Sequence, residues 1–288
     1  MELSSGIIFG LISMLGFGLS SSLSPIPAKR LGVMNAVFFR GIFMCLIFIL
    51  LLPFFLSGTT FSSKYILIAL AISVLAFIPL STFLKALSIG KLGIISPIAN
   101  SSIIFTVLFS ILFFNESLNT VQFGSILLIL LGIILISINF KDIKNSHIFK
   151  MSSGIPYALL TCVLWGLMFS LYKIPVMVIG PILTALIIEI GIFIISLIQI
   201  LKTGKKINMP DRSTLNYLIL LSIFTAIGGA FFNFGIMVAE VSIVAAISMA
   251  NPLIATIYGK YVYKETISIQ QYLAISFILI GIVALSFF

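Results

Sequence analysis

Ten apolar segments run through this chain of 288 residues, and only short polar stretches separate most of them. A helix of about 20 apolar residues crosses the roughly 30 Å hydrocarbon layer of a bilayer. Lipid offers backbone amides no partner, so each segment must be a helix. The sequence therefore predicts an all-α integral membrane protein with ten transmembrane helices, at residues 5–25, 34–55, 65–87, 92–113, 120–139, 153–173, 181–201, 214–237, 241–263 and 269–287.

Composition supports lipid as the main solvent, because 61% of the residues are hydrophobic and only 8% are charged. An ordinary soluble domain carries about 25% charged residues. The net charge of +9 comes from residues between the apolar segments, so we attribute it to membrane topology and expect no nucleic-acid partner. Cys45 and Cys162 have no metal-ligand spacing and are interpreted as packing residues. We expect neither a metal nor a cofactor.

The sequence indicates an internal repeat, with each half of the chain as one unit. Glu116, Gln122 and Gly132 recur 149 residues later as Glu265, Gln271 and Gly281. A second set recurs at an offset of 148, with Gly6, Gly18, Pro27 and Gly32 answered by Gly154, Gly166, Pro175 and Gly180. Chance likeness between apolar helices is the alternative. Five spans per half is an odd number, which predicts two inverted five-helix repeats. Their bounds are 1–140 and 153–288, joined by a polar connector at 141–152.

Charge predicts the orientation of the chain in the membrane. Lysine and arginine gather in or beside the odd-numbered loops, whereas the even-numbered loops hold only Lys64 and Lys173. The positive-inside rule then places the odd loops in the cytoplasm and both termini outside.

The closing motifs of the two halves resemble those of a known family. They read Glu116-Ser117, Gln122 and Gly132, then Glu265-Thr266, Gln271 and Gly281. Together with Trp165-Gly166 and Arg40, they resemble the drug/metabolite transporter superfamily in its EamA-type ten-helix branch. The resemblance implies a carrier of small metabolites, often an exporter of amino acids or related compounds. It implies a central cavity lined by helices one, three, four, six, eight and nine. It also implies cytoplasmic termini, against the charge distribution.

Polar and aromatic side chains at helical spacing mark one face of several spans. Buried amides need partners in lipid, so we expect these faces to point inward and line a substrate cavity. The alternative is that the polar groups only hold helices together. The candidate cavity residues are Phe17, Ser20, Ser96, Asn100, Trp165, Tyr172, Asn233, Ser248, Asn251 and Tyr258.

Two prolines are candidate gating residues. Pro97 and Pro252 lie near the starts of helices four and nine. Proline removes a backbone donor and frees a carbonyl one turn earlier, which lets a helix bend or expose that carbonyl. A static kink is the alternative reading.

Arg40 and Glu189 are the charges deepest in membrane segments, where a charge costs roughly 3 kcal/mol on insertion scales. Each lies about 10 Å from the start of its helix. Inversion places the two near opposite faces, so a direct salt bridge is not assured. Arg40 is then a candidate for snorkelling, and Glu189 for proton coupling.

We therefore expect a secondary transporter of the cell membrane that works by alternating access and exports its substrate. A flippase-like carrier of lipid-linked sugar is the alternative. A membrane-embedded enzyme is disfavoured, because the chain has one histidine and no recognisable catalytic motif. The expected partners are a small-molecule substrate, the lipid bilayer and protons. The sequence leaves monomer and homodimer both open.

Overall fold

The computed structural model describes residues 2–137, 151–204, 206–262, 264 and 267–287. These residues form helices, short 3-10 turns and loops, with no strand among them. Most of the connector expected at 141–152 lies outside the described residues. The first half contains α1 (Glu2–Leu23), α2 (Pro25–Arg30), α3 (Val33–Leu51), η1 (Leu52–Gly58), α4 (Ser63–Ile89), α5 (Leu92–Asn100), α6 (Ile103–Phe114) and α7 (Thr120–Ser137).

The second half repeats this order. It contains η2 (Met151–Ser153), α8 (Ile155–Leu171), α9 (Lys173–Ile179), α10 (Pro181–Lys202), α11 (Arg212–Val238), α12 (Val241–Ser248), α13 (Pro252–Val262) and α14 (Ile269–Ser286). Within the described residues, nine helical stretches are long and apolar enough to span a membrane, and α7 is a shorter apolar helix that we count as the tenth. Large apolar side chains are exposed along the outer surface of these helices, as lipid contact requires.

The fourth span of each half, predicted as one segment, is broken shortly after Pro97 and directly before Pro252, the two prolines expected to bend these helices. The first break is a turn at Ser101 and Ser102, between α5 and α6. The second runs from Met249 to Asn251, between α12 and α13. At the breaks, side chains hydrogen-bond to nearby carbonyls, and Pro252 has no N–H with which to bond the Ser248 carbonyl. Asn100 donates to the Ser96 carbonyl at 2.8 Å, and Asn251 donates to the Ser248 carbonyl at 3.1 Å.

The two halves are related by a pseudo-twofold axis, because their contacts repeat when the halves are exchanged. A Cβ added to Gly132 on α7 would meet the Ala274 carbonyl oxygen and Ile278 on α14. A Cβ added to Gly281 on α14 would meet the Ser125 carbonyl oxygen and Ile129 on α7. The members of each equivalent pair, Gly132 and Gly281, Ser125 and Ala274, and Ile129 and Ile278, are 149 residues apart. Such reciprocal contacts define a twofold arrangement.

The same symmetry relates the other helix pairs. A Cβ on Gly18 of α1 would meet Ile254 and the Asn251 carbonyl oxygen, and one on Gly166 of α8 would meet Phe105 and the Ser102 carbonyl oxygen. Helix α1 packs along α11 as α8 packs along α4, and α3 packs against α10. With five spans per half, these repeats are inverted.

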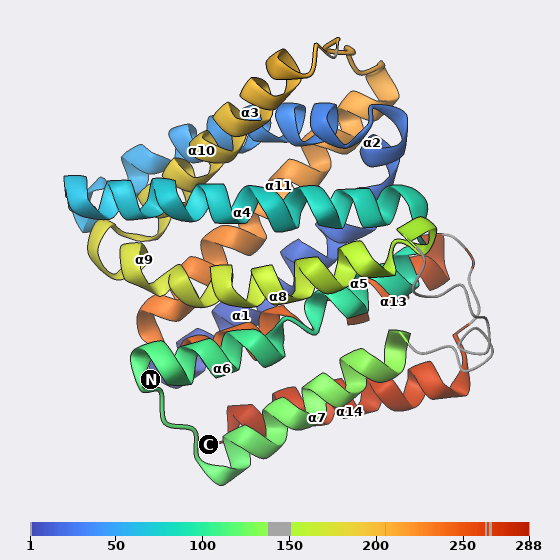
Figure 1. The fold of residues 1–288 in the computed structure, drawn as a ribbon. Coiled ribbons are helices and arrows are strands. Elements are labelled where there is room, and N and C mark those ends of the chain that lie inside the picture. The colour runs from blue at the N-terminus through green and yellow to red at the C-terminus, as the bar shows by residue number, and fades with distance from the viewer. Residues whose placement is uncertain (1, 138–150, 205, 263, 265–266, 288) are drawn as a thin grey trace.

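Both termini lie at the same end of the molecule, on the left of Figure 1. We call this the α12 end, because α12 begins and α6 ends there. We call the opposite end, where α5 begins and α13 ends, the α5 end. Helix α2 lies at the α5 end and its counterpart α9 at the α12 end (Figure 1).

Candidate functional site

A cavity of about 130 Å³ lies between the two halves, beside the breaks in the fourth spans. Its lining comes largely in repeat-related pairs, because the cavity straddles the pseudo-twofold axis. The pairs are Phe17 with Trp165, Ser20 with Met168, Ser21 with Phe169, Ser24 with Tyr172, Arg40 with Glu189, Leu80 with Gly229, Phe83 with Phe232, and Leu84 with Asn233. A central site between inverted repeats is the arrangement that transporters use.

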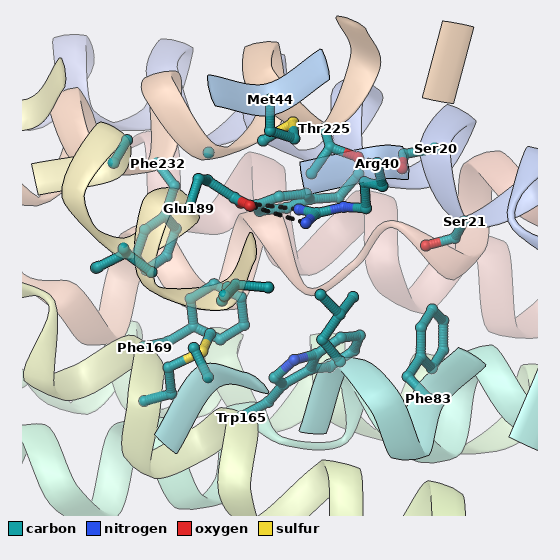
Figure 2. Close-up of a pocket in the computed structure, with 18 of the residues that line it drawn as sticks. Ser20, Ser21, Arg40, Met44, Phe83, Trp165, Phe169, Glu189, Thr225 and Phe232 are labelled. Atoms are coloured by element: carbon teal, nitrogen blue, oxygen red, sulfur yellow. Dashed lines mark hydrogen bonds and ion pairs between the residues drawn. The ribbon is translucent and has the colours of Figure 1, made fainter. Parts of the chain in front are cut away.

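Arg40 and Glu189 form a buried, bidentate ion pair in the wall of the cavity (Figure 2). Arg40 Nη1 donates to Glu189 Oε2 and Arg40 Nη2 donates to Oε1, both at 2.9 Å. Their side chains are only 8% and 10% exposed. A planar guanidinium matches a carboxylate in this geometry and also matches the carboxylate of a ligand.

The expectation that Arg40 and Glu189 lie near opposite faces is wrong. Helices α3 and α10 pack side by side. They run in opposite directions, because Phe38 early in α3 stacks on Phe193 late in α10, whereas Phe48 late in α3 clusters with Ile182 early in α10. Arg40 is the eighth residue of α3 and Glu189 the ninth of α10. Arg40 lies about 10 Å and Glu189 about 12 Å from the start of its helix, toward the centre of a roughly 30 Å span. The pairing also removes snorkelling as the explanation of Arg40.

Two asparagines join the broken spans across the cavity. Asn251 donates from Nδ2 to Asn100 Oδ1 at 2.6 Å, while both residues stay at least 98% buried. The same Nδ2 also donates to the Ser248 carbonyl, which fixes the orientation of the Asn251 amide. Asn251 Oδ1 is therefore a buried acceptor without a partner.

Asn233 presents a second free acceptor. Its Nδ2 donates to the Pro181 carbonyl at 3.0 Å, which leaves the Asn233 Oδ1 buried and without a partner. Leaving a buried acceptor unpaired costs free energy, and a ligand donor in the cavity removes that cost. Asn233 and Asn251 both line the cavity, and their unpartnered amide oxygens lie just beneath its surface, with almost no accessible area of their own.

The two ends of the cavity differ in chemistry although the repeat relates them. Ser20, Ser21 and Ser24 approach it beside α2, with Thr225 near Ser20. Their counterparts at the end of α8 are Met168, Phe169 and Tyr172. Figure 2 shows Ser20, Ser21 and Thr225 on one side and Phe169 and Phe232 on the other. The serines therefore gather on one side of the cavity, where Phe83 also lies, and the described residues on the other side include aromatic residues but no serine.

Two further pockets lie at the ends of the molecule and are inverted counterparts of each other. The α5-end pocket, of about 600 Å³, is lined by Lys91, Ile94 and Gln271 among others. The α12-end pocket, of about 430 Å³, is lined by the counterparts Glu240, Ile243 and Gln122.

Comparison with known proteins agrees with this architecture. The sequence profile of the EamA-like transporter family matches residues 4–138 and 152–287, one match for each half. The chain belongs to the EamA-like transporter family.

Two proteins and a solved structure are similar to this EamA-like protein. An uncharacterized transporter of Helicobacter pylori is 26% identical over 283 residues, which cover 95% of this chain and 93% of the relative. An uncharacterized protein of Methanocaldococcus jannaschii is 30% identical over 136 residues, covering 47% of this chain and 98% of that protein. That relative therefore has about the length of one half. A crystal structure with 15% identity superposes with a TM-score of 0.78 and covers 98% of this chain and 96% of its own, which shows a shared fold.

The structure of this EamA-like protein gathers most of the candidate residues around the central cavity. Those lining it are Phe17, Ser20, Arg40, Asn100, Trp165, Tyr172, Glu189, Asn233 and Asn251. Ser96, Pro97 and Pro252 instead line the α5-end pocket. Ser248 is buried with its hydroxyl unpartnered, and Tyr258 packs in an apolar cluster beside α3 and α10. Neither Ser248 nor Tyr258 lines these pockets.

Helices two and seven also line the cavity, which the family resemblance did not imply. They are α3 and α10, and they supply Arg40, Met44, Phe48, Ala185, Ile188, Glu189 and Ile192. The repeat itself indicates this contact, because Arg40 and Glu189 are 149 residues apart and therefore occupy equivalent positions in the two halves. Equivalent positions near a twofold axis face each other.

Proposed function

We propose that this EamA-like protein is a secondary transporter of the cell membrane, which exports small zwitterionic metabolites such as amino acids by alternating access. The observation that carries the proposal is the buried Arg40–Glu189 pair in a cavity on the axis between inverted repeats. A carboxylate of the substrate would exchange for Glu189 on Arg40, and an ammonium would exchange for Arg40 on Glu189. Asn233 and Asn251 line the same cavity, and a small shift of its wall would bring their unpartnered amide oxygens to that ammonium.

The size and lining of the cavity support a small solute with an apolar part. Its volume of about 130 Å³ is close to that of a cavity of about 150 Å³ that holds one benzene molecule. Phe169, Tyr172 and Phe232 offer an apolar wall for a hydrocarbon side chain. The same volume disfavours the alternative of a lipid-linked sugar, whose head group alone exceeds it.

Alternating access gives Pro97 and Pro252 a gating role. Both line the α5-end pocket, where the half-helices α5 and α13 meet. Pro252 is the first residue of α13, where its missing N–H leaves no bond unmade. Pro97 lies inside α5 and prevents a regular bond there. Replacing either with alanine is expected to slow transport more than it lowers the folded yield.

A thermal-unfolding assay of the purified protein tests the substrate class. Leucine, leucinamide and 4-methylpentanoate share a side chain, but only leucine carries both charges. A ligand that binds the folded state raises Tm in proportion to its occupancy. We expect leucine, or another apolar amino acid with its matched amide and acid, to raise Tm, and the two singly charged analogues to raise it less. Equal shifts from all three compounds would refute a zwitterion site.

A matched variant identifies the cavity as the place of binding. Replacing a buried ion pair by apolar residues of similar size is often neutral for stability. The double variant Arg40→Met/Glu189→Met should therefore remain folded and lose the Tm shift. A full Tm shift in that folded variant would place binding elsewhere.

A further inference from the structure

Glu116 lies between the two halves at the α12 end, outside the membrane spans. Helix α6 ends at Phe114, and Asn115 adopts a left-handed conformation with φ of 51°. This turn directs Glu116 back over the first turn of α12, where its side chain is only 1% exposed. Glu116 belongs to the first half, and its partners belong to the second.

Four hydrogen bonds converge on the Glu116 carboxylate. The backbone amides of Val241 and Ser242 donate to it at 2.8 and 3.0 Å, and the Ser242 hydroxyl donates at 2.7 Å. Lys173 Nζ donates at 2.9 Å and also lies 3.7 Å from Glu240. A carboxylate over the first turn of a helix is stabilised by the helix dipole. We call Glu116, Lys173, Glu240, Val241 and Ser242 the Glu116 cluster.

Because the halves are repeats, the same positions can be compared at the α5 end. Lys173 corresponds to Pro25, Glu240 to Lys91, and Ser242 to Gly93. Proline supplies no ammonium and glycine no hydroxyl, so these counterparts cannot donate the side-chain hydrogen bonds that Glu116 receives. Glu265, the counterpart of Glu116, lies outside the described residues.

Burial follows the same asymmetry. At the α12 end, Val241, Ser242 and Ile243 are each at most 1% exposed. At the α5 end, the counterparts Leu92 and Ile94 are half-buried and Gly93 is exposed. The pocket is also larger there, about 600 Å³ against about 430 Å³. The first turn of α12 is sealed, whereas the first turn of α5 is open.

We infer that Glu116 and Lys173 are gating residues that hold the α12 end shut, so that the substrate-free protein rests open toward the α5 end. Alternating access requires the two halves to separate at one end as they close at the other. Opening the α12 end must break the hydrogen bonds that Glu116 makes across the halves. The sequence difference between two symmetric ends thus sets the resting state. The inference rests on the proposed transport cycle, but its test requires no substrate.

Matched cysteine reporters at Ile243 and Ile94, which are 149 residues apart, measure access to each end. Cys45 and Cys162 are first replaced with alanine, and labelling by a bulky polar maleimide is timed in the purified protein. We expect Ile94→Cys to react faster than Ile243→Cys. Adding Lys173→Met should raise the Ile243→Cys rate at least about fivefold, the lower end of typical coupling between sites, and should lower the Ile94→Cys rate.

Controls separate gating from loss of packing. Lys91→Met, at the exposed counterpart of Glu240, should leave the Ile243→Cys rate unchanged, because Lys91 lies at the opposite end of the molecule. If Lys173→Met does not fold, Ser242→Ala removes one hydrogen bond and should shift both rates in the same directions by a smaller factor. Unchanged rates in folded variants, or a rise at both ends together, would overturn the inference. A failed substrate screen alongside reciprocal labelling would refute the proposed function and leave the gate standing.

Discussion

At the scale of single residues, two buried carboxylates each form an ion pair with a basic residue from the other half of the chain. Arg40 meets Glu189 at the centre, and Lys173 meets Glu116 at the α12 end. A buried pair gains stability only while both members are present, because one member alone is an uncompensated charge.

The Arg40–Glu189 pair therefore predicts strong coupling between two substitutions. Arg40→Met and Glu189→Met should each lower the free energy of unfolding by about 3–5 kcal/mol, and the double variant should lower it by much less than their sum. Thermal unfolding of the four proteins in detergent gives this cycle. Additive losses would mean that the two side chains contribute independently.

Acid should open the Glu116 cluster only at low pH. Burial raises the pKa of the Glu116 carboxyl, but the hydrogen bonds from Ser242, Lys173 and Val241 outweigh it and hold the pKa below its usual 4.5. A lowered pKa contributes stability above the usual value and loses it as the pH falls through the folded value. Burial and the nearby Glu116 charge raise the pKa of Glu240, whose protonation leaves the Glu116–Lys173 bond intact.

We accordingly expect the labelling rate of Ile243→Cys, corrected for the reactivity of a free thiol, to stay low from neutral pH to about pH 5. It should rise only below the usual carboxylate pKa of 4.5. Relaxation of the α12 end between pH 8 and 6 would point to a different titrating group.

At the scale of elements, the pair α7 and α14 is held by two glycines in reciprocal contacts. A Cβ at Gly132 would lie 2.6 Å from Ile278 Cγ1, and a Cβ at Gly281 would lie 2.6 Å from Ile129 Cγ1. Close approach of this kind is how small residues drive helix pairing in lipid.

Gly132→Ala and Gly281→Ala should therefore destabilise the protein by similar amounts, each about 1–3 kcal/mol, as overpacking typically does. Gly124→Ala is the matched control on α7, because nothing lies within 4 Å of a Cβ there. That control should be neutral or stabilising by up to about 1 kcal/mol, since alanine favours a helix. Thermal unfolding compares the three. Unequal losses at Gly132 and Gly281 would argue against a symmetric contact.

At the scale of the whole molecule, the sequence predicted the fold and missed its interior details for identifiable reasons. Apolar length and the repeat of Gly132 as Gly281 predicted ten spans in two inverted halves, and both are confirmed. Pro97 and Pro252 predict a bend in each fourth span, but hydropathy does not show a full break, because it does not respond to Asn100 and Asn251 bonding with carbonyls one turn away. Depth along each helix does not reveal the Arg40–Glu189 pair, because it contains no information on how α3 packs against α10.

The whole-molecule architecture leaves the orientation of the protein in the membrane as a prediction. The repeats fix that both termini share one end, but charge and family resemblance still assign that end to opposite sides of the membrane. Proton coupling through Glu189 and the choice between monomer and homodimer likewise stay predictions, as does the cytoplasmic placement of the basic loops.

The central claim is that the cavity on the pseudo-twofold axis carries a solute across the membrane. Counterflow of a labelled apolar amino acid into proteoliposomes tests this claim most directly, with empty liposomes and the folded Arg40→Met/Glu189→Met variant in parallel. The account predicts uptake that depends on the protein and on internal unlabelled amino acid, and that is lost in the variant. Uptake equal in the variant and the unmodified protein, or no protein-dependent uptake of any zwitterion, would contradict it.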